Sequence, residues 1–163
     1  MTKMVEPMAH VQDAAAYILH ARGPMSAMKL QKLCYYAYGY HLAWENRALF
    51  PERFEAWANG PVCPVLYEQH RGRFMLQDGT ISGEPTELDD GERESIDLVL
   101  DAYGDFTAHQ LSLMTHHESP WLNARVRAGA APLERTREPL RDDEIYEYFD
   151  SLAAAADDAS AEG

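Results

Sequence analysis

The stretch SAMKLQKLCYYAYGYHLAW, residues 26–44, decides the fold of this chain. Ser26 is a natural N-cap, and Leu30, Leu33 and Ala37 fall on one stripe of the helix that it opens. Four tyrosines make this predicted helix aromatic nearly all round. Such a helix is either central to a core or covered by a partner.

Start and stop signals for further helices recur on both sides of this stretch. Gly23-Pro24 ends a preceding helix, and Pro64 fits the first turn of a following one. Ser119-Pro120 is a clean start for another helix, with a capping residue followed by proline at the first helical position. We therefore expect a mainly α fold, a single compact domain of about six to seven helices.

A small antiparallel β element completes the predicted fold. Its candidate strands lie near residues 54–57, 80–82 and 137–140, where short apolar or extended segments are bounded by turn signals. We place one domain over residues 8–152. Residues 153–163 form an acidic, alanine-rich tail that we expect to be flexible.

The charge of the chain lies in two zones. The formal net charge is −13, of which residues 84–105 and residues 142–163 each contribute −8, so the remainder carries +3. Both zones can be solvated faces, or they can guide a basic partner electrostatically. So acidic a chain repels phosphate, and no apolar run is long enough to span a bilayer, so neither nucleic acid nor a membrane is an expected partner.

The sequence shows no pattern typical of a catalytic site or a cofactor site. It lacks the glycine-rich phosphate loops, the G-x-S-x-G nucleophile turn and the H-E-x-x-H zinc motif. Cys34 and Cys63 have no paired spacing and stand in apolar segments, so we expect buried thiols and a reducing, cytoplasmic compartment. We accordingly predict no enzymatic activity and no cofactor.

Three motifs, in order along the chain, are similar to those of the Panacea domain, also called SocA-like or DUF4065. The first is residues 28–36, MKLQKLCYY; the second is EAWANGPVCP with Leu66-Tyr67, from residue 55; the third runs from Leu111-Ser112 to Pro120-Trp121. The ordered set is more specific than any one motif. The resemblance implies a mainly helical fold with a small β element and no catalytic activity.

The same resemblance implies an antitoxin of a bacterial or phage toxin–antitoxin system. Such a protein neutralises its cognate toxin by direct protein–protein contact. The resemblance also implies a proteolytic adaptor that delivers the toxin to an AAA+ protease of the ClpXP type. The expected partners are therefore the toxin and this protease.

The motif residues divide into two predicted roles. The structural group, expected in the core or at a backbone turn, is Leu30, Leu33, Trp57, Gly60, Pro61, Leu111 and Trp121. The group expected to contact the toxin, chosen for polar or aromatic character inside the motifs, is Lys29, Lys32, Tyr36, Tyr40, Glu55, Tyr67 and His116.

Two alternatives of other classes remain open. A metal-dependent enzyme would use His109, His116 and His117, although the first two stand about 10 Å apart along a helix axis. A DNA-binding regulatory module would use basic and aromatic side chains such as Lys29 and Lys32 beside the tyrosines. Two lysines in so acidic a chain favour instead solvated charges on the exposed edge of a helix.

Overall fold

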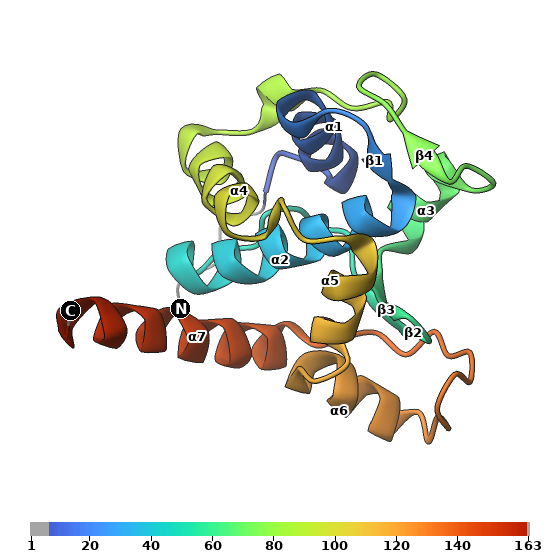
Figure 1. The fold of residues 1–163 in the computed structure, drawn as a ribbon, viewed down its shortest axis with the longest axis vertical. Coiled ribbons are helices and arrows are strands. Elements are labelled where there is room, and N and C mark those ends of the chain that lie inside the picture. Colours follow the sequence, from blue (N-terminus) through green and yellow to red (C-terminus); the bar gives the residue numbers. More distant parts are fainter. Residues whose placement is uncertain (1–6, 163) are drawn as a thin grey trace.

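The structure, a computed structural model, describes residues 7–162 and is mainly helical (Figure 1). Within these residues the α-helices are α1 (Val11–Arg22), α2 (Ala27–Glu45), α3 (Pro64–His70), α4 (Asp90–Tyr103), α5 (Ala108–Thr115), α6 (Ser119–Arg127) and α7 (Asp142–Glu162). None of the helices in the described part is both long and apolar enough to span a bilayer. The mainly α fold, with seven helices, is confirmed.

The β structure consists of two small antiparallel pairs. Strand β1 (Met25–Ser26) pairs with β4 (Met75–Leu76), and β2 (Glu55–Trp57) pairs with β3 (Gly60–Val62). A single 3₁₀ turn, η1 (Pro85–Glu87), precedes α4.

The strand predictions were right in only one place. Residues 54–57 supply β2, and the predicted strand near 137–140 contributes a single bridge between Pro139 and Glu55. The segment 80–82 is not a strand, because the chain turns there and the backbone N–H of Ser82 is bonded by the Gln69 side chain instead of a neighbouring strand. Gly60 and Pro61, predicted at a backbone turn, belong to β3.

Helix α2 is the central element of the fold (Figure 1). Thirteen of its nineteen residues are buried, which explains its nearly uniform apolar surface. Its N-cap is Ser26, whose hydroxyl accepts the backbone N–H of Lys29 at 3.1 Å. Helices α4 and α7 flank α2 on different sides. The sequence allowed either a helix at the centre of the core or one covered by a partner, and the structure shows a helix at the centre of the core.

The contact of α2 with α7 is aromatic. The Phe149 ring on α7 is fully buried and lies edge-on to Tyr35, Tyr36 and Tyr40, with ring centres 4.9–5.9 Å apart. Beyond Phe149 the helix continues through most of the segment predicted as a tail, which is exposed over residues 154–159. The flexibility of that segment stays a prediction.

Gly39 lets this contact form. A Cβ at this position would collide with the Phe149 ring, since the two helices meet there with no space for a methyl group. We expect Gly39→Ala to lower the free energy of unfolding by about 1–3 kcal/mol, because the ring must move out of its packed position. Urea denaturation followed by circular dichroism measures the change.

The matched control is the same substitution in a Phe149→Leu background. There the smaller side chain leaves room, so Gly39→Ala should cost clearly less than it does opposite phenylalanine. Equal costs in the two backgrounds would contradict this account of the contact.

Candidate partner-binding site

The β2–β3 hairpin is fixed from one side by polar side chains of α2. Gln31 accepts the backbone N–H of Cys63 at 2.9 Å and donates to the carbonyl of the same residue at 3.2 Å. Lys32 donates from Nζ to the carbonyl of Pro61 at 3.1 Å. Both side chains are buried, so the expectation of solvated charges on an exposed helix edge is wrong for Lys32. They satisfy backbone groups that a three-residue strand cannot pair by itself.

Helices α5 and α6 hold the hairpin from the other side. From α5, Ser112 Oγ donates to the carbonyl of Asn59 at 2.6 Å. From α6, Trp121 Nε1 donates to the carbonyl of Trp57 at 2.8 Å, and Arg125 Nη1 donates to the carbonyl of Ala56 at 3.0 Å. The three sequence motifs therefore meet at one hairpin, which explains why they are separated along the chain.

Gly60 lies at the point where side chains of α2 and α5 come closest to the hairpin backbone. Its φ of +119° is a backbone conformation that favours glycine. A Cβ there would also lie 2.6 Å from Lys32 Cε and 2.7 Å from Thr115 Oγ1. The predicted structural role of Gly60 is thus to let α2 and α5 contact the hairpin at the same point.

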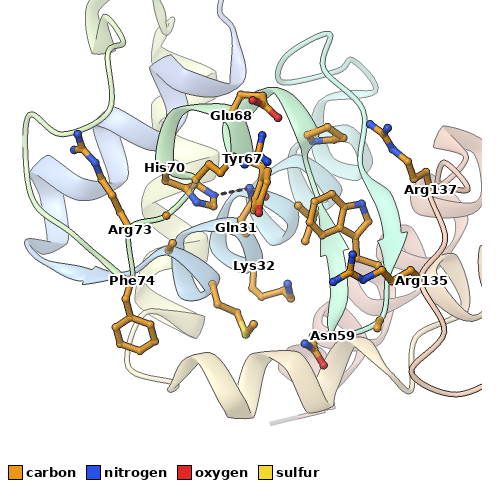
Figure 2. A pocket seen from close by; sticks show the side chains of 18 of the residues that line it. Gln31, Lys32, Asn59, Tyr67, Glu68, His70, Arg73, Phe74, Arg135 and Arg137 are labelled. Atoms are coloured by element: carbon orange, nitrogen blue, oxygen red, sulfur yellow. Dashed lines mark hydrogen bonds between the residues drawn. The ribbon is translucent and has the colours of Figure 1, made fainter.

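A pocket of about 960 Å³ opens beside the hairpin, between β3, α3 and the loop that precedes α7 (Figure 2). We call it the basic pocket. Its lining residues are Ala27, Met28, Gln31, Lys32, Trp57, Ala58, Asn59, Val62, Pro64, Tyr67, Glu68, His70, Arg71, Gly72, Arg73, Phe74, Arg135, Thr136 and Arg137.

The charge of the basic pocket is opposite to that of the whole protein. Five basic side chains and one carboxylate, Glu68, line it, although the chain carries −13. Figure 2 shows Arg73 on one side and Arg135 and Arg137 on the other, with Lys32 between them. Of these, Arg137 is paired with Glu55, Nε to Oε1 3.4 Å. In the described part of the chain, Arg71, Arg73 and Arg135 have no salt-bridge partner.

Aromatic side chains supply the apolar surface of the pocket. The rings of Trp57 and Tyr67 meet edge to face at 5.0 Å, and Tyr67 meets His70 in the same way at 5.3 Å. Phe74 lies at the rim with 79% of its surface exposed. A pocket lined by partly buried tryptophan and tyrosine and by arginines, with an exposed phenylalanine at its rim, has the composition of an interface core.

Lys32 is electrostatically unusual. Its side chain is buried, and among the described residues no carboxylate pairs with it. Burial lowers its pKa from 10.5 to about 7, because removal from water disfavours the charged amine. Proton uptake by Lys32 in the folded protein therefore costs free energy unless an anion approaches it.

The predicted toxin-contacting residues lie in several places. Lys32 and Tyr67 line the basic pocket, and Glu55 lies at its edge, bonded to Arg137 and to the indole N–H of Trp57. Lys29 lies outside the pocket and donates to the carbonyl of Gly104 at 2.6 Å.

The remaining candidates serve internal contacts. Tyr36 is fully buried and donates to Glu118 at 2.7 Å; burial raises the pKa of that carboxyl to about 7. Tyr40 shares a hydrogen bond of 2.7 Å with Tyr103, and His116 stacks on Trp121 with ring centres 4.4 Å apart. The prediction of a surface role for Tyr36 is wrong in this structure, because the ring packs inside the core.

In the structural group, the leucines and Trp121 are buried, whereas Gly60 and Pro61 lie in β3 and Trp57 needs a correction. Leu30, Leu33 and Leu111 are fully buried, and Trp121 is 8% exposed. Trp57, predicted as a core residue, is only partly buried and forms a wall of the pocket. Its indole N–H bonds to Glu55 at the surface, so the ring lies at the boundary between core and solvent.

The pocket arginines were missed by reasoning from the sequence. They form two Arg-x-Arg triplets, Arg71-Gly72-Arg73 and Arg135-Thr136-Arg137, both outside the acidic zones. That repetition was the signal, but 61 residues lie between the triplets and nothing local indicates that they face one pocket.

The geometry gives the metal alternative no support. Within the described residues, no group of three or more histidine, cysteine, aspartate or glutamate side chains is arranged to hold a metal ion. His116 is engaged in stacking on Trp121, while His109 and His117 are exposed.

The lowered pKa of Lys32 predicts a pH dependence of stability. Between about pH 7 and pH 10.5 the unfolded chain holds a proton at Lys32 that the folded chain has released, so the free energy of unfolding rises with pH. The rise is at most about 5 kcal/mol, because the pKa of Lys32 falls from 10.5 to about 7 and one pKa unit corresponds to ~1.4 kcal/mol. Lys32→Met should remove this rise, whereas Lys29→Met should keep it.

Urea denaturation at several pH values between 7 and 10.5 checks this expectation. Other groups also titrate in this range, so the quantity of interest is the difference between each variant and the parent chain. A Lys32→Met protein whose stability follows the parent at every pH would contradict the assignment.

Comparison with known proteins places this arrangement in a family. Residues 30–122, more than half of the chain, match the family model described as antitoxin SocA-like, Panacea domain. The chain is also 33% identical over 110 residues to Antitoxin SocA of Caulobacter vibrioides (strain NA1000 / CB15N). That alignment covers 60% of this chain and 58% of the relative, so it spans less than two thirds of that protein. No solved structure matches. The matched range runs from the fourth residue of α2 through the hairpin to the first residues of α6, and the chain therefore belongs to the SocA-like antitoxin family with a Panacea domain.

Proposed function

We propose that this protein is an antitoxin that binds a cognate toxin protein and neutralises it by direct contact, without catalysing a reaction. Membership of the SocA-like family supports the antitoxin role. The observation that carries the proposal is the basic pocket, which the partly buried rings of Trp57 and Tyr67 line and at whose rim Phe74 is 79% exposed. Such a patch suits a protein partner, because aromatic and arginine side chains dominate binding energy at interfaces.

The acidic zones add a long-range component to this proposal. The two acidic zones, residues 84–105 and 142–163, each contribute −8 to the net charge. Several of their acids are bonded within the protein, such as Asp89 and Glu92 to Arg47 and Asp97 to Tyr17, whereas Glu94, Asp101, Asp157 and Asp158 are exposed. A basic toxin would be attracted by these zones and would associate faster at low salt. Short-range recognition then takes place at the pocket.

Substitution at the rim tests the proposal without disturbing the core. The protein is co-expressed with the product of the neighbouring gene, and copurification and rescue of growth are measured. Phe74→Ser should weaken binding at least tenfold, because it removes an exposed anchor of the interface. The matched control is Val126→Ser on α6, which is 78% exposed and lies outside the pocket.

Two outcomes would count against the proposal. The first is failure of the parent chain to copurify with, or rescue growth from, the neighbouring product. The second is equal weakening by Phe74→Ser and Val126→Ser, which would place the interface elsewhere.

We further propose that the protein delivers the bound toxin to a ClpXP-type protease. The support is the family resemblance, and the test is a reconstituted degradation assay. An adaptor should increase the rate of toxin degradation by the purified protease, and Phe74→Ser should abolish the increase at limiting concentration. A toxin that is inhibited but no faster degraded would leave neutralisation by contact as the whole activity.

A further inference from the structure

We propose that the basic pocket recognises a carboxylate on an extended segment of the partner protein, an inference that rests on the proposed function. Lys32 at the floor of the pocket and Arg73 and Arg135 at its rim would bind the carboxylate. The carboxylate is either the C-terminus of the partner or an aspartate or glutamate side chain. Nothing in the family relationship assigns a ligand to this pocket; the assignment comes from its geometry and charge.

The first argument is the incomplete coordination of Lys32. Its ammonium group has three donors, and one of them is bonded to the Pro61 carbonyl at 3.1 Å. Gly60 leaves room for the side chain to reach this position. A buried amine without a counter-ion among the described residues is costly, whereas an incoming carboxylate would pair with it in a water-poor site.

The second argument is the placement of the arginines. Arg73 and Arg135 lie on opposite sides of the opening and are exposed, with no salt-bridge partner in the described part of the chain. A guanidinium group binds a carboxylate through two parallel hydrogen bonds. Figure 2 shows the Arg135 guanidinium near Lys32 and the Arg73 guanidinium directed outward, so Arg73 must turn inward from the rim to meet an anion that enters the pocket.

The third argument distinguishes a peptide from a nucleic acid. The pocket rings contact each other edge to face, at 65° for Trp57 with Tyr67 and 83° for Tyr67 with His70, so these neighbouring pairs offer no parallel slot for a base. The rest of the chain is strongly acidic and repels a polyanion. A single carboxylate on an otherwise neutral or basic segment meets the positive pocket without this repulsion.

Proton linkage gives the proposal a specific signature. A bound carboxylate stabilises protonated Lys32, so affinity should fall as the pH rises from 7 to 9. The titratable and charged groups on the elements packed around Lys32 are Cys63, Glu68, His70, Arg71, Arg73, His116, Glu118, Arg125, Arg135 and Arg137. Burial lowers the pKa of both histidines and raises that of Cys63 to about 11, so none of these three titrates in this window.

The experiment uses the full chain and a peptide array. Random acetylated hexapeptides are displayed in three forms: with a free C-terminal carboxylate, with a C-terminal amide, and with a C-terminal amide and one internal glutamate. We expect binding to a subset of sequences, at least tenfold stronger when a carboxylate is present. The form that binds identifies whether a chain terminus or a side chain is recognised.

Two pairs of variants with equal loss of charge make the result specific. Arg73→Gln/Arg135→Gln should abolish the carboxylate preference, while Arg53→Gln/Arg141→Gln, at exposed sites outside the basic pocket, should retain it. The Lys32→Met variant should bind carboxylate-bearing peptides at least tenfold more weakly than the parent chain at pH 7. Its affinity should not decline as the pH rises to 9. Thermal melts verify that each variant is folded.

Several results would overturn the inference. They are no binding to any peptide, equal binding to acid and amide forms, equal effects of the two variant pairs, and displacement by a single-stranded 12-mer oligonucleotide. The copurification assay is independent of this array. A protein that binds its toxin but ignores carboxylates would contradict this inference and leave the proposed function intact.

Discussion

Four backbone carbonyls of one short hairpin, each bonded by a helix side chain, are the constraint on which the rest of the structure depends. The strands contain three residues each, too few to be stable alone. Lys32 from α2, Ser112 from α5, and Trp121 and Arg125 from α6 supply the missing hydrogen bonds. The hairpin in turn forms one wall of the basic pocket, so the positions of three helices determine the shape of the surface that meets a partner.

The negative and positive charges of the protein lie on different parts of the fold and act over different distances. Its negative charge lies on helices, where acids in the first turns also stabilise the helix dipole, as with Asp89, the N-cap of α4. Its positive charge gathers where two loops approach the hairpin. The two fields act at different distances: the helices influence approach through solvent, while the pocket acts only on a group that has already entered it.

Much of the fold could be predicted from the sequence, because its signals are local. The cap at Ser26, the stop at Gly23-Pro24 and the proline at the start of α3, Pro64, lie within a few residues of the helix ends that they determine. The aromatic surface of α2 likewise indicated a central helix. Short strands such as β4 were missed because two residues carry no periodic pattern, and their pairing depends on a distant segment.

The site was predictable only in part, since it is made by tertiary contacts. Tyr67 was chosen for its character and does line the pocket, whereas Tyr36, of the same type, lies in the core. The hairpin explains why the motifs belong together, and it has a consequence for engineering. Transplanting residues 55–62 into another helical scaffold would leave their carbonyls without donors. A functional graft must carry the donor side chains of three helices with it, so the smallest exchangeable unit of this protein is the whole hairpin and its supports.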